Sequence, residues 1–300
     1  MAAARSEGET RGGWGDGVKL ALGTLSVLPV GVPRVVDRGV AGRAMVLGPA
    51  IGVVLGGVAA GVVAGVQALQ PGAALLAAVL GVVVLAVLSG ALHLDGLADT
   101  ADGLGSRRDR ETMLRIMKQS DIGPFGVVSI VAVLLIDVAA LTACIQAGFG
   151  WQSILIATVA SRLTLPWSCR TTIPSARPDG LGAMVASTVS PLALTLTTLL
   201  TLAATTALAL SPSTPSTATS SPAAVATSTT PYAGAPIPEA LGAHAAHLLA
   251  AALAVILAIT VALLMTRKAR RTFGGITGDT LGATVELALP AALLTLALTT

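Results

Sequence analysis

Charged and aromatic side chains are scarce in this chain. Only 11% of its 300 residues are Asp, Glu, Lys or Arg, and Phe, Trp and Tyr together make up 2%. A soluble domain usually carries about 25% charged residues, so the composition argues against a soluble globular protein. The formal net charge of +3 is too small to indicate nucleic acid as a partner.

Cysteine is also rare. Cys144 and Cys169 stand alone, with no second cysteine or histidine at metal-ligand spacing, and both lie in or beside apolar segments. This pattern excludes a disulfide framework or a zinc-finger site and predicts two buried, unreactive thiols. The polar, glycine-containing start, residues 1–16, lacks the pattern of a cleavable signal peptide.

Long apolar runs dominate what is present, since 54% of the residues are hydrophobic. Runs near the thickness of a bilayer recur along the whole chain, which predicts an all-α, polytopic integral membrane helix bundle with about seven transmembrane helices. We expect one membrane-embedded domain over residues 1–300. An apolar stretch at Val18 to Val32, interrupted by Pro29, is too short to span and predicts an interfacial or re-entrant N-terminal helix. The expected spans are 45–69, 73–92, 126–147, 152–168, 188–210, 244–266 and 281–299.

Basic residues support this topology. With seven spans, every Lys and Arg except Arg162 falls on one side of the membrane. The positive-inside rule makes that side cytoplasmic, so we expect a multi-pass protein of the cytoplasmic (inner) membrane with its active site facing the cytoplasm. On the other side, residues 211–243 are mostly Ser, Thr, Pro and Ala. We interpret them as a disordered, low-complexity loop insertion with no catalytic part.

The most informative segment runs from His93 to Gly103, directly after an apolar run. Asp95, Asp99 and Asp102 are spaced i, i+4, i+7, which places three carboxylates on one face of a helix. Such carboxylates repel one another unless a cation neutralises them, and Mg²⁺ prefers oxygen ligands and keeps substrate phosphates in its shell. The pattern therefore predicts a metal-dependent, phosphate-handling site at a membrane surface. A solvated acidic helix face is the alternative.

Other polar motifs lie on the same predicted side. A basic segment from Arg107 to Lys118 leads to Asp121, and Lys118 and Asp121 are its best functional candidates, although the segment could simply face lipid headgroups. Arg162 lies inside a predicted span, where a charge is a functional candidate, and we expect it to contact phosphate rather than to extend to the interface. His93 either contacts substrate or is an interfacial histidine.

A glycine-rich turn precedes the last predicted helix. Gly274, Gly275 and Gly278 lead to Asp279, and glycines at a helix start let backbone amides approach an anion. An ordinary tight turn is the alternative. Glu286 follows Asp279 by seven residues on the same helix face and could support the site, whereas Asp137 lies within a span with no motif around it.

These segments carry a resemblance to a known family. The sequence Leu92-His93-Leu94-Asp95-Gly96-Leu97-Ala98-Asp99-Thr100-Ala101-Asp102-Gly103 resembles the hallmark of the cobalamin synthase family, the adenosylcobinamide-GDP ribazoletransferases. The resemblance continues in chain order from about residue 20 to about residue 290. The chain departs from the family pattern at Leu25-Ser26, where the family often has Thr-Arg, and in the 211–243 insertion. The further matching segments are 23–30, 115–126, 160–162 and 274–283.

The resemblance implies a membrane enzyme that joins α-ribazole, or its 5′-phosphate, to adenosylcobinamide-GDP and releases GMP, with Mg²⁺ as cofactor and the lipid bilayer as its environment. In that reaction Asp95, Asp99 and Asp102 would hold the metal. Asp121 or Asp102 would accept the hydroxyl proton, and Lys118 would hold phosphate oxygens of the substrate. The implied substrate-binding residues are His93, Arg162, Gly274, Gly275, Gly278 and Asp279. The sequence does not decide the preferred nucleophile, the lower-ligand base, the number of metal ions or whether the protein forms a homo-oligomer.

Two other functions compete with this interpretation. A CDP-alcohol phosphatidyltransferase also uses spaced aspartates at a membrane surface, and Asp99 to Gly103 begins to match its signature. Ser106-Arg107 replaces the Ala-Arg of that signature, however, and its second half is absent. A transporter would require ionisable residues near several span centres or broken helices in paired halves. The clustering of polar motifs on one side disfavours it.

Overall fold

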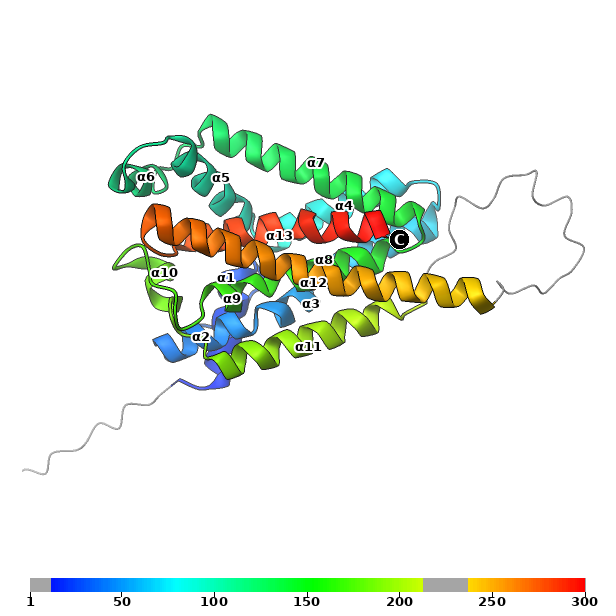
Figure 1. Ribbon diagram of the computed structural model, residues 1–300, viewed down its shortest axis with the longest axis horizontal. Helices are drawn as coiled ribbons and strands as arrows, with labels where there is room; N and C mark the ends of the chain where they lie inside the picture. Colours follow the sequence, from blue (N-terminus) through cyan, green and yellow to red (C-terminus); the bar gives the residue numbers. More distant parts are fainter. Residues whose placement is uncertain (1–11, 213–236, 300) are drawn as a thin grey trace, which may run out of the picture.

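The structure is a computed structural model that describes residues 12–212 and 237–299. Helices run side by side along the long axis of the molecule (Figure 1). Within the described ranges there is no strand, and only two isolated bridges, Arg170 with Val189 and Ser175 with Ile276, join extended segments. The expected all-α bundle is confirmed.

Within residues 12–212 and 237–299, five helices are long and apolar enough to cross a membrane on their own. A sixth candidate is a bent pair, α4 (Ala74–Leu88) with α5 (Leu92–Gly105), whose axes differ by 86°. The expected count of seven is therefore not confirmed. The five helices are α3 (Gly48–Leu69), α7 (Pro124–Gln146), α11 (Pro191–Ala209), α12 (Ile237–Phe273, over its part His244–Phe273) and α13 (Gly278–Thr299).

The bend between α4 and α5 has a local cause. Gly90 and Ala91 both have positive φ, +62° and +54°, so the backbone enters the left-handed region where a right-handed helix cannot continue. The apolar helix ends at Leu88 instead of running on to residue 92. The acidic motif thus begins a new helix, which turns away from the axis of α4 and lies towards the end of the bundle that carries α6 and α10 (Figure 1).

The expected span at 152–168 is divided into α8 (Gly150–Arg162) and α9 (Thr164–Ser168), and neither meets the length for a span. In α8 every residue except Trp151 is buried. Gly48, Gly52 and Gly56 of α3 allow this close packing, because a Cβ atom at each would lie 2.8 to 2.9 Å from atoms of α8. This central position explains why α8 carries buried polar side chains: their surroundings are protein rather than lipid.

The N-terminal apolar stretch is helical only in part. α1 (Trp14–Leu25) ends before Pro29, and α2 (Arg38–Val46) is capped by Asp37, whose side chain accepts a hydrogen bond of 2.7 Å from the Val40 amide. The short helices α6 (Arg110–Ile116) and α10 (Gly180–Val185) lie at one end of the bundle, and the C-terminal end of α13 lies at the other (Figure 1).

The expected insertion falls largely outside the described residues. Residues 213–236 are not described, whereas residues 237–243 form the start of α12, so the helix begins before the expected residue 244. Cys144 and Cys169 are both free and buried, as the sequence predicts. His247 of α12 stacks on Phe149, with ring centroids 4.1 Å apart.

Candidate functional site

An acidic cavity forms where α5 faces the segment that follows α6. It has a volume of about 310 Å³, and it brings together Asp95 and Asp99 from α5 with Lys118 and Asp121 from the connection to α7. Four of the residues expected from the sequence therefore share one cavity. The lining residues are Asp95, Ala98, Asp99, Met117, Lys118, Gln119, Ser120, Asp121, Ile122 and Ile130.

Asp102 is held in a different way from the other two aspartates. One of its carboxylate oxygens accepts a hydrogen bond of 2.7 Å from the Gly123 amide, and the other accepts one of 2.9 Å from the Gly126 amide. These amides belong to the first turn of α7, where backbone N–H groups have no partner within the helix. Asp102 therefore fixes the start of α7 against α5. Its metal-binding and proton-accepting roles stay predictions.

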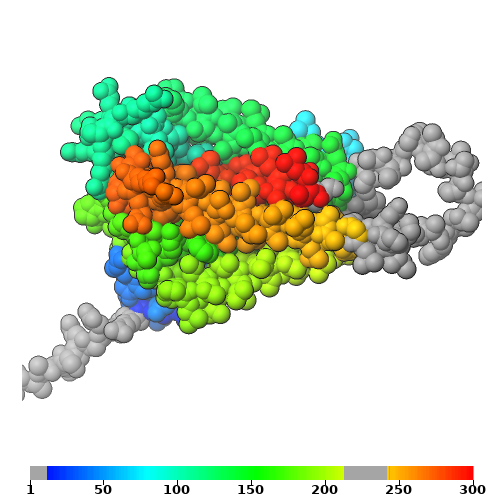
Figure 2. Space-filling view, in the orientation of Figure 1, coloured from blue at the N-terminus to red at the C-terminus, as the bar shows by residue number. Residues whose placement is uncertain are grey.

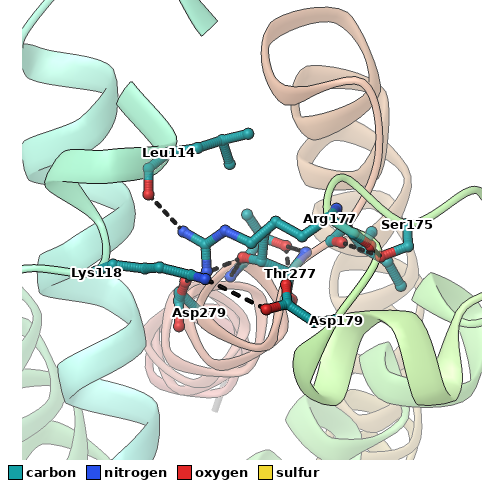
Figure 3. Close-up of polar contacts among 9 residues, drawn as sticks. Leu114, Lys118, Ser175, Arg177, Asp179, Thr277 and Asp279 are labelled. Carbon is teal, nitrogen blue, oxygen red and sulfur yellow. Dashed lines mark hydrogen bonds and ion pairs between the residues drawn. The ribbon is translucent and has the colours of Figure 1, made fainter. Parts of the chain in front are cut away.

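A second group of polar side chains closes the same region (Figure 3). The guanidinium of Arg177 donates a hydrogen bond of 2.7 Å to the carbonyl oxygen of Leu114 in α6, and its other nitrogen lies 3.5 Å from a carboxylate oxygen of Asp279. Thr277 also donates to Asp279, at 3.2 Å. Lys118 and Asp179 lie 3.6 Å apart, and both are exposed. Arg177 thus connects α6 to the start of α13.

Sequence analysis missed Arg177. No motif surrounds it, and the only available signal was its place on the basic side of the membrane, next to a Pro-Asp-Gly turn at 178–180. Its two partners lie 63 and 102 residues away in the chain, so only the tertiary structure brings them together.

The carboxylates of this region repel one another. The negative charges of Asp95, Asp279 and Asp102 repel that of Asp99, and the positive charge of Arg177 attracts it. Gly96 makes this proximity possible, because a Cβ atom there would lie 2.7 Å from the carbonyl oxygen of Asp279, so only glycine lets α5 approach α13 so closely. Carboxylates that repel one another beside an open cavity attract cations.

The residues present fit a magnesium ion that has only one or two protein ligands. Among the described residues no three His, Cys, Asp or Glu side chains gather tightly enough to hold a metal by themselves. Mg²⁺ is usually bound through one or two carboxylates, with waters and substrate phosphates completing its shell. Asp95 and Asp99, on one wall of a polar cavity, match that arrangement.

The glycine-rich turn before α13 serves close backbone packing. Gly274 has a φ of +82°, and a Cβ atom there would lie 2.6 Å from the guanidinium carbon of Arg110. A Cβ atom at Gly275 would lie 2.4 Å from the carbonyl oxygen of Pro174, beside a pair of backbone hydrogen bonds that join this turn to the loop at 174–176. Gly278 has only ordinary contacts with Leu181. A phosphate-binding role for the three glycines stays a prediction.

His93 lies on the inner side of the site. It is buried and lines a mainly apolar cavity of about 180 Å³, which Asp279 and Gly278 also line. Its Nδ1 lies 3.9 Å from a carboxylate oxygen of Glu286, and neither ring nitrogen has a hydrogen bond within the described structure. His93 therefore lies between this cavity and the centre of the bundle.

Arg162 lies deeper in the bundle and does not line the acidic cavity. It donates a hydrogen bond of 2.9 Å to Ser161, and the charges of Glu286 and Asp137 interact with it. This interaction gives a physical account of Asp137, since a buried cation in a membrane needs nearby anions. The expected phosphate contact of Arg162 is not tested by this geometry.

Comparison with known proteins identifies relatives along nearly the whole chain. The family profile described as cobalamin-5-phosphate synthase matches residues 17–297. A protein of Nocardioides sp. named adenosylcobinamide-GDP ribazoletransferase is 35% identical over 281 residues, which cover 93% of this chain and 97% of that protein.

Two shorter matches carry the same name. The protein of Frankia casuarinae is 43% identical over 178 residues, which cover 57% of this chain and 64% of that protein. The protein of Pseudomonas putida (strain GB-1) is 38% identical over 168 residues, which cover 56% of this chain and 68% of that protein. No solved structure matches this chain.

Proposed function

Because this chain belongs to the cobalamin-5-phosphate synthase family, we propose that it acts as an adenosylcobinamide-GDP ribazoletransferase, the activity for which its relatives are named. The observation that carries the proposal is the acidic cavity, where Asp95, Asp99, Lys118 and Asp121 meet at one end of a membrane bundle. The family match decides against the CDP-alcohol phosphatidyltransferase and the transporter.

The proposed reaction exchanges one phosphorus–oxygen bond for another. A sugar hydroxyl of α-ribazole, or of its 5′-phosphate, attacks the phosphorus that carries the cobinamide. The pyrophosphate bond to the guanosine phosphate breaks, GMP leaves with the bonding electron pair, and the hydroxyl proton passes to a base. Since a product made from ribazole 5′-phosphate keeps that phosphate, the attacking group is a hydroxyl other than the 5′ one.

The residues of the acidic cavity take complementary roles. We assign proton acceptance to Asp121, because it is exposed on the cavity wall, whereas both oxygens of Asp102 already accept backbone hydrogen bonds. Lys118, on the same wall, attracts the phosphate oxygens of the substrate as a point charge. Asp95 and Asp99 would hold Mg²⁺, which neutralises charge on the diphosphate when it is bound.

The neighbouring apolar cavity would take an apolar part of a substrate. His93 and Asp279 are polar groups on an otherwise mainly apolar wall, so they can orient what binds there. Arg177 fixes Asp279 relative to α6 and thereby the two cavities relative to each other. Arg162 would act on His93 through Glu286, with which both interact.

Cell location and orientation are part of the same proposal. The described basic residues other than Arg162 fall in the segments at the end of the bundle that carries α6 and α10. By the positive-inside rule this end faces the cytoplasm, which makes the cytoplasmic membrane the site of the enzyme.

A product assay tests the proposed function. Purified protein is supplied with adenosylcobinamide-GDP, α-ribazole 5′-phosphate and Mg²⁺, and mass spectrometry follows the product and GMP together. We expect equal amounts of adenosylcobalamin 5′-phosphate and GMP. An Asp121→Asn variant serves as the control for the catalytic assignment. GMP release without ribazole would indicate a hydrolase, and no product with folded protein would overturn the proposal.

A further inference from the structure

A second cavity, lined mainly by arginine residues, lies on another face of the same end of the bundle. It has a volume of about 540 Å³, and four arginines line it: Arg170, which follows α9, and Arg267, Arg270 and Arg271 in the last turns of α12. Its other two lining residues are Leu263 and Thr266. The α12 end that carries these arginines is exposed on the face shown in Figure 2, in orange.

Among the residues that the structure describes, no acidic side chain forms an ion pair with this arginine group. Among the described residues the ion pairs are those of His93, Lys118 and Arg177, and none involves the four arginines. Arg170 donates a hydrogen bond to the carbonyl oxygen of Trp167. Burial, and then the positive charge of Arg270, lower the pKa of Arg170. Repelling guanidinium groups around an open cavity are therefore arranged for an anion from outside the chain.

The position of the cavity along α12 distinguishes between kinds of anion. Leu263 belongs to the apolar part of α12, and Arg267 begins its basic end. Below the arginines, α12 exposes Leu264, Ile256 and Leu257. A phosphate held by the arginines would thus lie directly above an apolar helix surface, which is how a phospholipid places its headgroup above its acyl chains.

This cavity is separate from the proposed active site. The two cavities share no lining residue. A different face of α12 meets the active-site region, where Ala269 and Phe273 pack with Met113 and Met117 of the α6 segment. A ligand of the arginines is therefore not explained by the proposed reaction.

We propose that Arg170, Arg267, Arg270 and Arg271 form a binding site for the phosphate group of an anionic phospholipid. Basic pockets between membrane helices on the cytoplasmic side bind such headgroups, and each basic residue near a membrane surface adds affinity for anionic lipid. Bound lipid would relieve the repulsion between Arg170 and Arg270 and fix the end of α12 against α9.

Native mass spectrometry of the full-length protein in neutral detergent tests the proposal. The probes are phosphatidylglycerol, phosphatidylcholine and inorganic phosphate, and the variant is Arg170→Gln with Arg270→Gln. We expect the wild type to bind phosphatidylglycerol in preference to the other two probes. Each removed arginine should weaken this binding about fivefold, and the double variant should weaken it about thirtyfold.

A matched control removes the same charge elsewhere. Lys268→Gln with Arg108→Gln changes two exposed basic residues that do not line the cavity, and one of them lies on α12 itself. We expect this control to bind lipid as the wild type does. Equal losses of lipid binding in both double variants would indicate a general attraction of anionic lipid to a basic protein. If inorganic phosphate binds as tightly as phosphatidylglycerol does, the cavity is a site for free anions. Either result overturns the proposal.

The melting temperature of the lipid-free proteins gives an independent readout. If the arginines repel one another while the site is empty, Arg270→Gln alone, which leaves the Arg170–Trp167 hydrogen bond in place, should melt no lower than the wild type. A lower melting temperature without lipid would assign these arginines to the internal structure of the protein and would also overturn the proposal.

Discussion

Replacing Asp102 by Asn separates a structural role of this residue from a metal-binding one. The two carboxylate oxygens accept hydrogen bonds of 2.7 and 2.9 Å from the amides of Gly123 and Gly126. The Asn side chain can accept only one of them, and its NH₂ group then faces the other amide. A hydrogen bond to a charged group contributes about 1.5–3 kcal/mol, so we expect about 2 kcal/mol of lost stability. At about 2–4 °C per kcal/mol, the melting temperature should fall by about 4–8 °C.

Asp95→Asn is the matched comparison, because Asp95 lies on the same helix and its side chain is exposed to the acidic cavity. Removing its charge reduces repulsion with Asp99 and Asp279, so the melting temperature should stay level or rise. Activity should nevertheless fall at least about a hundredfold, as for the loss of one preorganised electrostatic contact. Both variants are measured by thermal unfolding in detergent and by the product assay. An Asp102→Asn protein that melts like the wild type but is inactive would refute the structural argument and favour metal binding.

Four further outcomes are expected. A cysteine at Ser216 should react with an impermeant thiol reagent from outside the cell, and one at Ser106 only after the membrane is opened; the reverse labelling would refute the proposed orientation. Deleting residues 213–236 should preserve insertion and turnover, since each doubling of loop length costs only about 0.6 kcal/mol, and an inactive but membrane-inserted protein would contradict this. Arg177→Gln should reduce turnover at least about tenfold by freeing α6 from α13, with partial recovery in Arg177→Lys, whereas full activity in Arg177→Gln would remove it from the site. Chelation with EDTA should abolish turnover and Mg²⁺ should restore it, and unchanged turnover would exclude a metal held by Asp99.

Local patterns predicted the features that depend on neighbouring residues in the chain. The i, i+4, i+7 spacing correctly placed Asp95 and Asp99 on one helix, and hydrophobic runs located the five helices that can each span a membrane. The bend after α4 was not predicted, because Gly90 alone does not mark the end of an apolar helix and alanine is not a residue that indicates a left-handed conformation. Arg177 was missed for a related reason, since its contacts join segments that are distant in the chain.

The 152–168 run shows a different limit of sequence analysis. Its hydrophobicity predicted a transmembrane helix, but α8 is surrounded by other helices and is too short to span by itself. Hydrophobicity alone does not distinguish burial in lipid from burial in protein. The distinguishing signals were present in the buried polar residues Gln152, Ser153 and Arg162, which protein neighbours accommodate and lipid does not.

The enclosed position of α8 has a consequence for how this protein is made. A helix of 13 residues that ends in Arg162 is a poor substrate for insertion by itself, since an arginine deep in the bilayer costs at least about 2.5 kcal/mol. Its partners lie on both sides of it in the chain: α3 is synthesised earlier, whereas Glu286 on α13 is synthesised near the end. We therefore expect α8 to wait at the translocon or the membrane surface until α13 emerges, so the centre of the molecule is completed only after its periphery.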